Sequence, residues 1–168
     1  MNAKTFLSKV EIGEITEKLE QQHDPVTLDC DGYLVTATLM RITKLKLGIR
    51  VYVNGWMRSE WLDPKRDHEE GRRFYRLAIK RLATAGDLKL FASVYGKRSK
   101  KYREAAARTF SFRASHWTSA TSMLRHFRAN NASVRLLDAE EAKLRIDALD
   151  VERTAAQEVA AAAKAGAE

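Results

Sequence analysis

The chain has 168 residues, of which 45% are hydrophobic and 31% charged, as expected for a globular protein and not for a disordered or collagen-like one. No apolar run reaches the roughly 18 residues that a transmembrane helix needs, and a single cysteine, Cys30, excludes an internal disulfide. Thirty Lys and Arg against 22 Asp and Glu give a net charge of +8, which favours a polyanionic partner and argues against an acidic mimic of DNA. With no secretion signal evident, we expect a cytoplasmic protein that does not enter membranes.

The first element expected is a helix over residues 8–22. Ser8 and Glu11 have the spacing of a capping box, and Asp24-Pro25 would end the helix. Ile15 and Leu19 lie at helical spacing and predict its buried side.

Strands are expected next, because the following residues are β-branched, aromatic or alternately apolar and polar. The expected strands are 26–28, 33–43, 49–53 and a short return strand at 56–62. Asp31-Gly32 and Asn54-Gly55 are typical of tight hairpin turns, whose central residues need positive φ. The region therefore predicts an antiparallel meander.

Residues 67–84 are expected to form a basic amphipathic helix. At about 100° per residue, four cations fall on one arc, with apolar residues such as Phe74 and Ile79 opposite. The four cations are Arg72, Arg73, Arg76 and Lys80. Gly86-Asp87 is expected to separate this helix from the next.

The rest of the chain is expected to contain further short elements. They are a helix at 88–95 that ends at Gly96, a mobile basic cluster at 97–103, an extended segment around 110–112, a helix at 118–129 and a strand at 133–137. Asp138 and Glu141 form a second capping pair that would open a long, alanine-rich helix. That helix packs on the domain, pairs with a second copy or docks on a partner, and the sequence does not decide between these.

The predicted fold class is α+β: a small antiparallel meander of three to four strands packed by helices, with a protruding C-terminal helix. Residues 1–137 are expected to form one domain and residues 138–168 a helical tail. Within the domain, residues 41–113 hold 20 basic and seven acidic residues, a net charge of +13. This central segment is where a polyanion would bind.

Several short motifs resemble, in the same order, those of a family of small bacteriophage proteins of unassigned activity. They are Tyr-Val-Asn-Gly-Trp at 52–56 followed by Glu60-Trp61-Leu62, Glu70-Gly71-Arg72-Arg73-Phe74, Gly96-Lys97-Arg98 with Lys100-Lys101, and Leu124-Arg125-His126 with Asn130. The resemblance covers residues 33–137. It implies a phage origin, a place in the cytoplasm of an infected bacterium and a role in host takeover or anti-defence.

The main candidate site is a basic surface that would contact the phosphate backbone of nucleic acid or of a host nucleoprotein complex. Its candidate residues are Arg72, Arg73, Arg76, Lys80, Lys97, Arg98, Lys100 and Lys101, with Arg58 and Trp56 beside them. Trp56, with Trp61 and Tyr52, could stack exposed bases. The alternative interpretation is a solvated surface without a ligand, whose cations pair with Asp67, Glu69 and Glu70.

Other functions find less support in the sequence. Asp63, Asp67 and Glu69 would serve a Mg²⁺-dependent nuclease, but acids are favoured at a helix N-terminus in any case. The order helix, three strands, helix over residues 9–84 is similar to that of double-stranded RNA-binding domains. No zinc motif or phosphate loop occurs. We expect a non-enzymatic binding module without cofactor or metal, of unknown oligomeric state; the alternative is an anti-defence inhibitor, of the anti-CRISPR kind, that binds a host protein complex.

Overall fold

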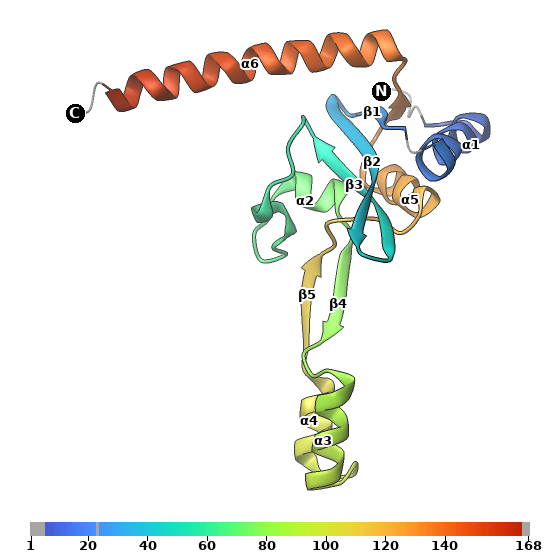
Figure 1. The fold of residues 1–168 in the computed structure, drawn as a ribbon, viewed down its shortest axis with the longest axis vertical. Coiled ribbons are helices and arrows are strands. Elements are labelled where there is room, and N and C mark those ends of the chain that lie inside the picture. Colours follow the sequence, from blue (N-terminus) through green and yellow to red (C-terminus); the bar gives the residue numbers. More distant parts are fainter. Residues whose placement is uncertain (1–5, 23, 166–168) are drawn as a thin grey trace. The chain divides into compact units, whose positions relative to one another are not determined.

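The computed structural model describes residues 6–22 and 24–165 and shows an α+β protein whose chain forms two compact units (Figure 1). The first unit comprises Met1–Arg58 and Ser115–Glu168, and the second comprises Ser59–Ala114. Each unit is described by itself. Among the described residues, no helix has the length and apolar character needed to span a bilayer.

The first unit contains a four-stranded antiparallel sheet with the order β3-β2-β1-β6. Its strands are β1 (Val26–Cys30), β2 (Tyr33–Thr43), β3 (Lys46–Val53) and β6 (Val134–Leu136). The expected three-stranded meander is confirmed, and the strand expected at 133–137 is β6, beside β1. Both predicted turns form, with positive φ at Asp31 and Gly32 and at Asn54 and Gly55.

Two helices of the first unit lie side by side and supply much of its core (Figure 1). They are α1 (Lys9–Glu17), which continues as the π-helical turn η1 (Lys18–Gln22), and α5 (Ala120–Asn130). The predicted capping box of α1 is present, with both hydrogen bonds between Ser8 and Glu11. Fully buried apolar side chains of these helices and of the sheet form one core: Ile15, Leu19, Leu28, Val35, Val51, Met123 and Phe127.

The last helix, α6 (Ala139–Ala165), packs on the sheet over its first half and extends past it (Figure 1). Its predicted cap is confirmed, because Glu141 donates its backbone N–H to Asp138 at 2.8 Å. Arg145 bonds Asp29 of β1 at 2.6 Å, and Arg153 donates to the backbone oxygen of Asn54 at 3.0 Å. Beyond Arg153 the described side chains, 154–158, are exposed.

The second unit begins with two short helices and then forms an antiparallel ribbon with a helical hairpin at its end (Figure 1). Its elements are the 3-10 helix η2 (Ser59–Leu62), α2 (Glu69–Phe74), β4 (Leu77–Arg81), α3 (Ala85–Tyr95), α4 (Lys100–Ala107) and β5 (Thr109–Arg113). Strands β4 and β5 form a separate two-stranded sheet. We call the continuous segment 77–113, from β4 through β5, the hairpin arm.

Three predictions for this region are wrong. The helix expected over 67–84 ends at Phe74, and Lys80 lies on a strand, because β4 pairs with the distant β5. The order helix, three strands, helix does occur over residues 9–74, but its last helix is α2, which has only six residues and belongs to the second unit. The return strand at 56–62 is reduced to one bridge between Val53 and Trp56, followed by η2.

The third error concerns the expected break at Gly86-Asp87, which lies in the first turn of α3, where Asp87 completes a capping box with Thr84. The basic cluster at 97–103, expected to be mobile, is half helical, since α4 begins at Lys100.

Candidate functional site

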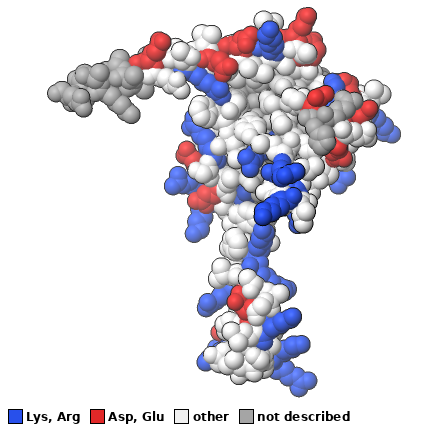
Figure 2. All heavy atoms as spheres, viewed as in Figure 1, with Lys and Arg blue, Asp and Glu red and all other residues white. Residues whose placement is uncertain are grey.

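The whole net charge of the protein lies in the hairpin arm. Residues 77–113 contain ten basic and two acidic residues, a net charge of +8, whereas the first unit has 15 of each and residues 59–76 have five of each. The cations of the arm are Lys80, Arg81, Lys89, Lys97, Arg98, Lys100, Lys101, Arg103, Arg108 and Arg113. Figure 2 shows Lys and Arg side chains gathered over this helical hairpin, with few acids among them.

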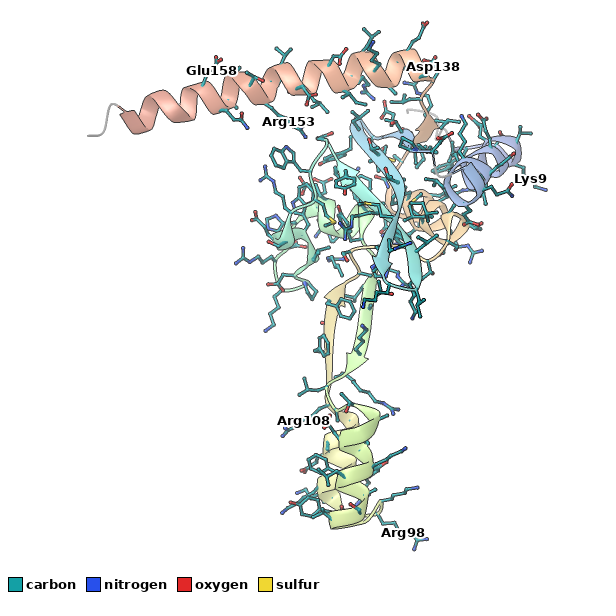
Figure 3. The ribbon with its side chains drawn as sticks, in the orientation of Figure 1. Lys9, Arg98, Arg108, Asp138, Arg153 and Glu158 are labelled. Atoms are coloured by element: carbon teal, nitrogen blue, oxygen red, sulfur yellow. The ribbon has the colours of Figure 1, made fainter. Side chains whose placement is uncertain are left out.

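The tip of the arm is the four-residue loop 96–99 between two helices, together with the first residues of the second helix, and four of the five residues at 97–101 are cations. Gly96, with a φ of 78°, ends α3, and Lys97 and Arg98 follow as exposed residues. Figure 3 labels Arg98 at this end of the arm. Ser99 then caps α4 by accepting a hydrogen bond from the Tyr102 backbone at 3.1 Å. The tip therefore combines side-chain charge with the positive end of a helix dipole.

The two acidic residues of the arm neutralise little of this charge. Asp87 accepts hydrogen bonds from the side chain and the backbone of Thr84, each at 2.7 Å, and these bonds lower the pKa of Asp87. Glu104 lies 3.8 Å from Lys100 in an exposed pair, which contributes little. Within the described residues, no ion pair involves Lys97, Arg98 or Arg103.

The predicted basic helix face is divided by the structure. Arg72 pairs with Asp67, and Arg73 pairs with Glu69 at 2.7 Å. These two arginines therefore have the acidic partners expected of a solvated surface without a ligand. Arg76 lies between α2 and β4, where its backbone oxygen accepts from Ala114 at 2.9 Å. The remaining predicted cations belong to the arm: Lys80, Lys97, Arg98, Lys100 and Lys101.

The predicted aromatic site around Trp56 belongs to the first unit and has a structural partner. Arg153 of α6 lies 4.7 Å from the Trp56 ring centroid, and Arg58 lies 6.0 Å from it. This cation–π contact helps to hold α6 on the sheet. Trp61 is buried in the second unit, 6.4 Å from Tyr75, and so is not available for stacking on bases.

Two aromatic residues that sequence reasoning did not assign to the site lie on the ribbon. Phe110 and Phe112 of β5 project from one face, with ring centroids 5.6 Å apart and planes inclined by 30°. Lys80 of β4 places its Nζ 5.0 Å from the Phe112 centroid. The signal was the alternation Phe-Ser-Phe, which in a strand directs both rings to the same side.

A pocket of about 330 Å³ lies where the ribbon meets the helical hairpin. It is lined by Leu82, Ala83, Asp87, Phe91, Lys101, Glu104, Ala105 and Arg108. Leu82 donates its backbone N–H to Arg108 at 2.9 Å, which extends the pairing of β4 and β5 by one step into the pocket. Figure 3 shows Arg108 at this junction.

The acids considered for a nuclease are engaged by neighbours. Asp63 accepts a hydrogen bond from the Lys65 backbone at 2.9 Å, while Asp67 and Glu69 pair with arginines of α2. In the part of the chain that the structure describes, no group of three His, Cys, Asp or Glu is placed to hold a metal ion. Cys30 is buried in β1, and His23 lies outside the described residues.

Comparison of the chain with protein-family models, with curated proteins and with solved structures found no match.

Proposed function

We propose that this protein binds nucleic acid, free or within a nucleoprotein, through the hairpin arm. The observation that carries the proposal is the concentration of the full net charge of +8 in 37 residues at one end of one unit. Phosphates neutralised by Lys and Arg release condensed counterions, which supplies most of non-specific affinity for nucleic acid. The arm is therefore the surface where this gain is largest.

The positions of the cations at the tip of the arm are better explained by a bound anionic ligand than by a structural role. Helix N-termini favour acidic side chains, yet the first turn of α4 contains Lys100 and Lys101 and no acid, and Lys97 and Arg98 precede it. Such an arrangement costs stability in the free protein. A phosphate at the tip would remove this cost, because its charge is favoured by both the side chains and the helix dipole.

The proposal includes the biological setting that the sequence resemblance implies. The protein would be phage-encoded and act in the cytoplasm of an infected bacterium, as a binding module without catalysis or cofactor. Its contacts with the phosphate backbone would leave the choice of nucleic-acid sequence to other features.

The test is the affinity of three forms of the protein for a labelled oligonucleotide, measured by fluorescence anisotropy. One form is unchanged, one has Lys97→Ala, Arg98→Ala and Arg103→Ala in the arm, and one has Arg41→Ala, Lys44→Ala and Lys46→Ala. The second set removes the same charge from exposed positions in the first unit. The arm variant should bind at least about tenfold more weakly, and the control variant should bind like the unchanged protein. Equal losses in both variants would mean that net charge alone, and not the arm, governs binding.

One observation favours a second function, the inhibition of a host protein complex. Leu90 and Val94 lie one turn apart on α3 and are 64% and 61% exposed. Exposed apolar residues at this spacing are typical of a helix that docks on a protein. Under this alternative, Leu90→Ser with Val94→Ser would abolish the inhibition of that complex, and the unchanged protein would bind no nucleic acid even at about 50 mM salt.

A further inference from the structure

The two faces of the β4–β5 ribbon differ in chemistry. Residues directly opposite each other in an antiparallel pair lie on the same face, and the register pairs Ala78 with Phe112 and Lys80 with Phe110. These four residues therefore share one face, which we call the aromatic face. The opposite face has no aromatic ring and is formed by two aliphatic residues, two hydroxyl-bearing residues and two arginines: Leu77, Ile79, Thr109, Ser111, Arg81 and Arg113.

The aromatic face continues into the pocket at the base of the helical hairpin. Leu82 and Arg108 follow Lys80 and Phe110 at the period of two that keeps side chains on one face, and both line the pocket. The pocket adds a further ring, Phe91, and a further cation, Lys101. One surface thus carries three phenylalanine rings in succession, Phe112, Phe110 and Phe91, with cations placed beside them.

The cations follow the same line as the rings. Lys80 lies over Phe112, and Arg108 and Lys101 line the pocket and are exposed. Phe110 is 46% exposed, although a phenylalanine on a strand usually packs into a core. Exposed rings beside a row of cations are the arrangement that binds unpaired nucleic acid, in which bases stack on the rings while the phosphates meet the cations.

We propose that the aromatic face and its pocket form a track for single-stranded nucleic acid, in which Phe110 and Phe112 stack on bases. The inference rests on the proposed function and adds the type of strand. In a duplex each base is already stacked on its neighbours and only its edges can be reached. The rings of Phe110 and Phe112 therefore find no free base face to stack on. In a single strand every base has a free face, and stacking tolerates any sequence.

The pocket suits one end of this track. Its volume of about 330 Å³ lies at the lower end of the usual range for small-ligand pockets, about 300–1,000 Å³. Phe91 supplies an apolar wall, and Glu104 supplies an acceptor for the amino group of a base. Lys101 and Arg108 can meet the adjoining phosphates, so a single nucleotide of the strand matches the groups that line the pocket.

The test compares binding to a thymidine oligonucleotide of about 20 nucleotides with binding to a duplex of the same length, by fluorescence anisotropy over about 50–200 mM salt. The test variant carries Phe110→Leu and Phe112→Leu, which keeps apolar side chains on the strand but removes the rings. The matched control carries Leu77→Ala and Ile79→Ala on the opposite face. A third variant, with Phe110→Tyr and Phe112→Tyr, keeps both rings, and circular dichroism checks that every variant is folded.

We expect the leucine variant to bind the single strand at least about tenfold more weakly, with an unchanged salt slope, because the rings are lost and the cations kept. Its affinity for the duplex should not change, and the tyrosine variant and the control should bind the single strand like the unchanged protein. Equal binding of the single strand by the leucine variant and the unchanged protein would overturn the aromatic track and leave the basic arm standing. Failure of the unchanged protein to bind either oligonucleotide at low salt would overturn both.

Discussion

Replacing Gly55 by alanine should cost the protein more stability than the same change at Gly32. Both glycines occupy the second position of a tight hairpin turn in the first unit, with φ of 74° and 89°. A side chain at either position strains the backbone by about 1–2 kcal/mol. The two sites differ in their surroundings, so Gly32 is a matched control for Gly55.

The extra cost at Gly55 comes from Arg153. A Cβ at Gly32 would meet nothing within 4 Å, whereas a Cβ at Gly55 would overlap the guanidinium of Arg153. That group, on the side chain labelled Arg153 in Figure 3, donates to the Asn54 backbone oxygen at 3.0 Å and lies 4.7 Å from the Trp56 ring centroid. A hydrogen bond from a charged group is worth about 1.5–3 kcal/mol, and Arg153 is 31% exposed, which reduces the loss to about 1–2 kcal/mol.

Urea denaturation measures the free energy of unfolding of both variants, alone and combined with Arg153→Ala. In the unchanged background, Gly55→Ala should destabilise by about 1–2 kcal/mol more than Gly32→Ala. With alanine at position 153, the two glycine substitutions should cost the same, because the contact that distinguishes them is gone. Equal costs in the unchanged background would refute the idea that Arg153 fastens α6 to the turn.

Two further predictions concern the second unit. Hydrogen bonds from Thr84 lower the pKa of Asp87, so the contribution of this cap to the stability of α3 is present above pH 3.8, the usual aspartate pKa, and is lost as the pH falls through the lower pKa of the folded state. A carbon-13 NMR titration should therefore give Asp87 a higher midpoint in the Thr84→Ala variant than in the unchanged protein. Identical midpoints would contradict the assignment. Gly71→Ala should destabilise the protein by at least about 1 kcal/mol, since the new Cβ would lie 2.5 Å from the Trp61 backbone oxygen, whereas Gly86→Ala, whose Cβ has ordinary space, should be neutral or stabilising in thermal unfolding.

The elements fixed by local chemistry were the ones that could be predicted from the sequence. Asp31-Gly32 and Asn54-Gly55 impose turns through their backbone conformation, so the meander between them followed directly. The capping pairs Ser8 with Glu11 and Asp138 with Glu141 likewise placed the first and last helices. In each case the deciding interaction spans a few residues.

The helix expected over 67–84 failed because a distant partner decides its structure. Residues 77–81 have apolar positions compatible with both a helix and a strand, and they become β4 by pairing with β5 at 109–113, some 30 residues away. The net charge of the central segment could be calculated from the sequence, but the positions of its cations in the fold could not be predicted. Only the ribbon brings Lys80 onto the same surface as Phe110 and Phe112.

The aromatic site expected at Trp56 could not be judged from the sequence for the same reason. Its ring is next to Arg58 in the chain, which suggested a stacking surface between cations. The closer cation is Arg153, which is 97 residues away in the sequence and comes from α6. A contact of this separation depends on how the helix packs and leaves no local pattern.

Binding through the hairpin arm is tested most directly by titrating the nitrogen-15-labelled protein with a single-stranded oligonucleotide and following the amide chemical shifts. If the arm binds the strand, the amide shifts that change should lie within residues 77–113, with the largest changes at residues 96–101 and along β5. The amide shifts of the first unit should not change. Changes concentrated in the first unit, for example around the β2–β3 turn, or no changes at all at low salt, would contradict binding through the arm.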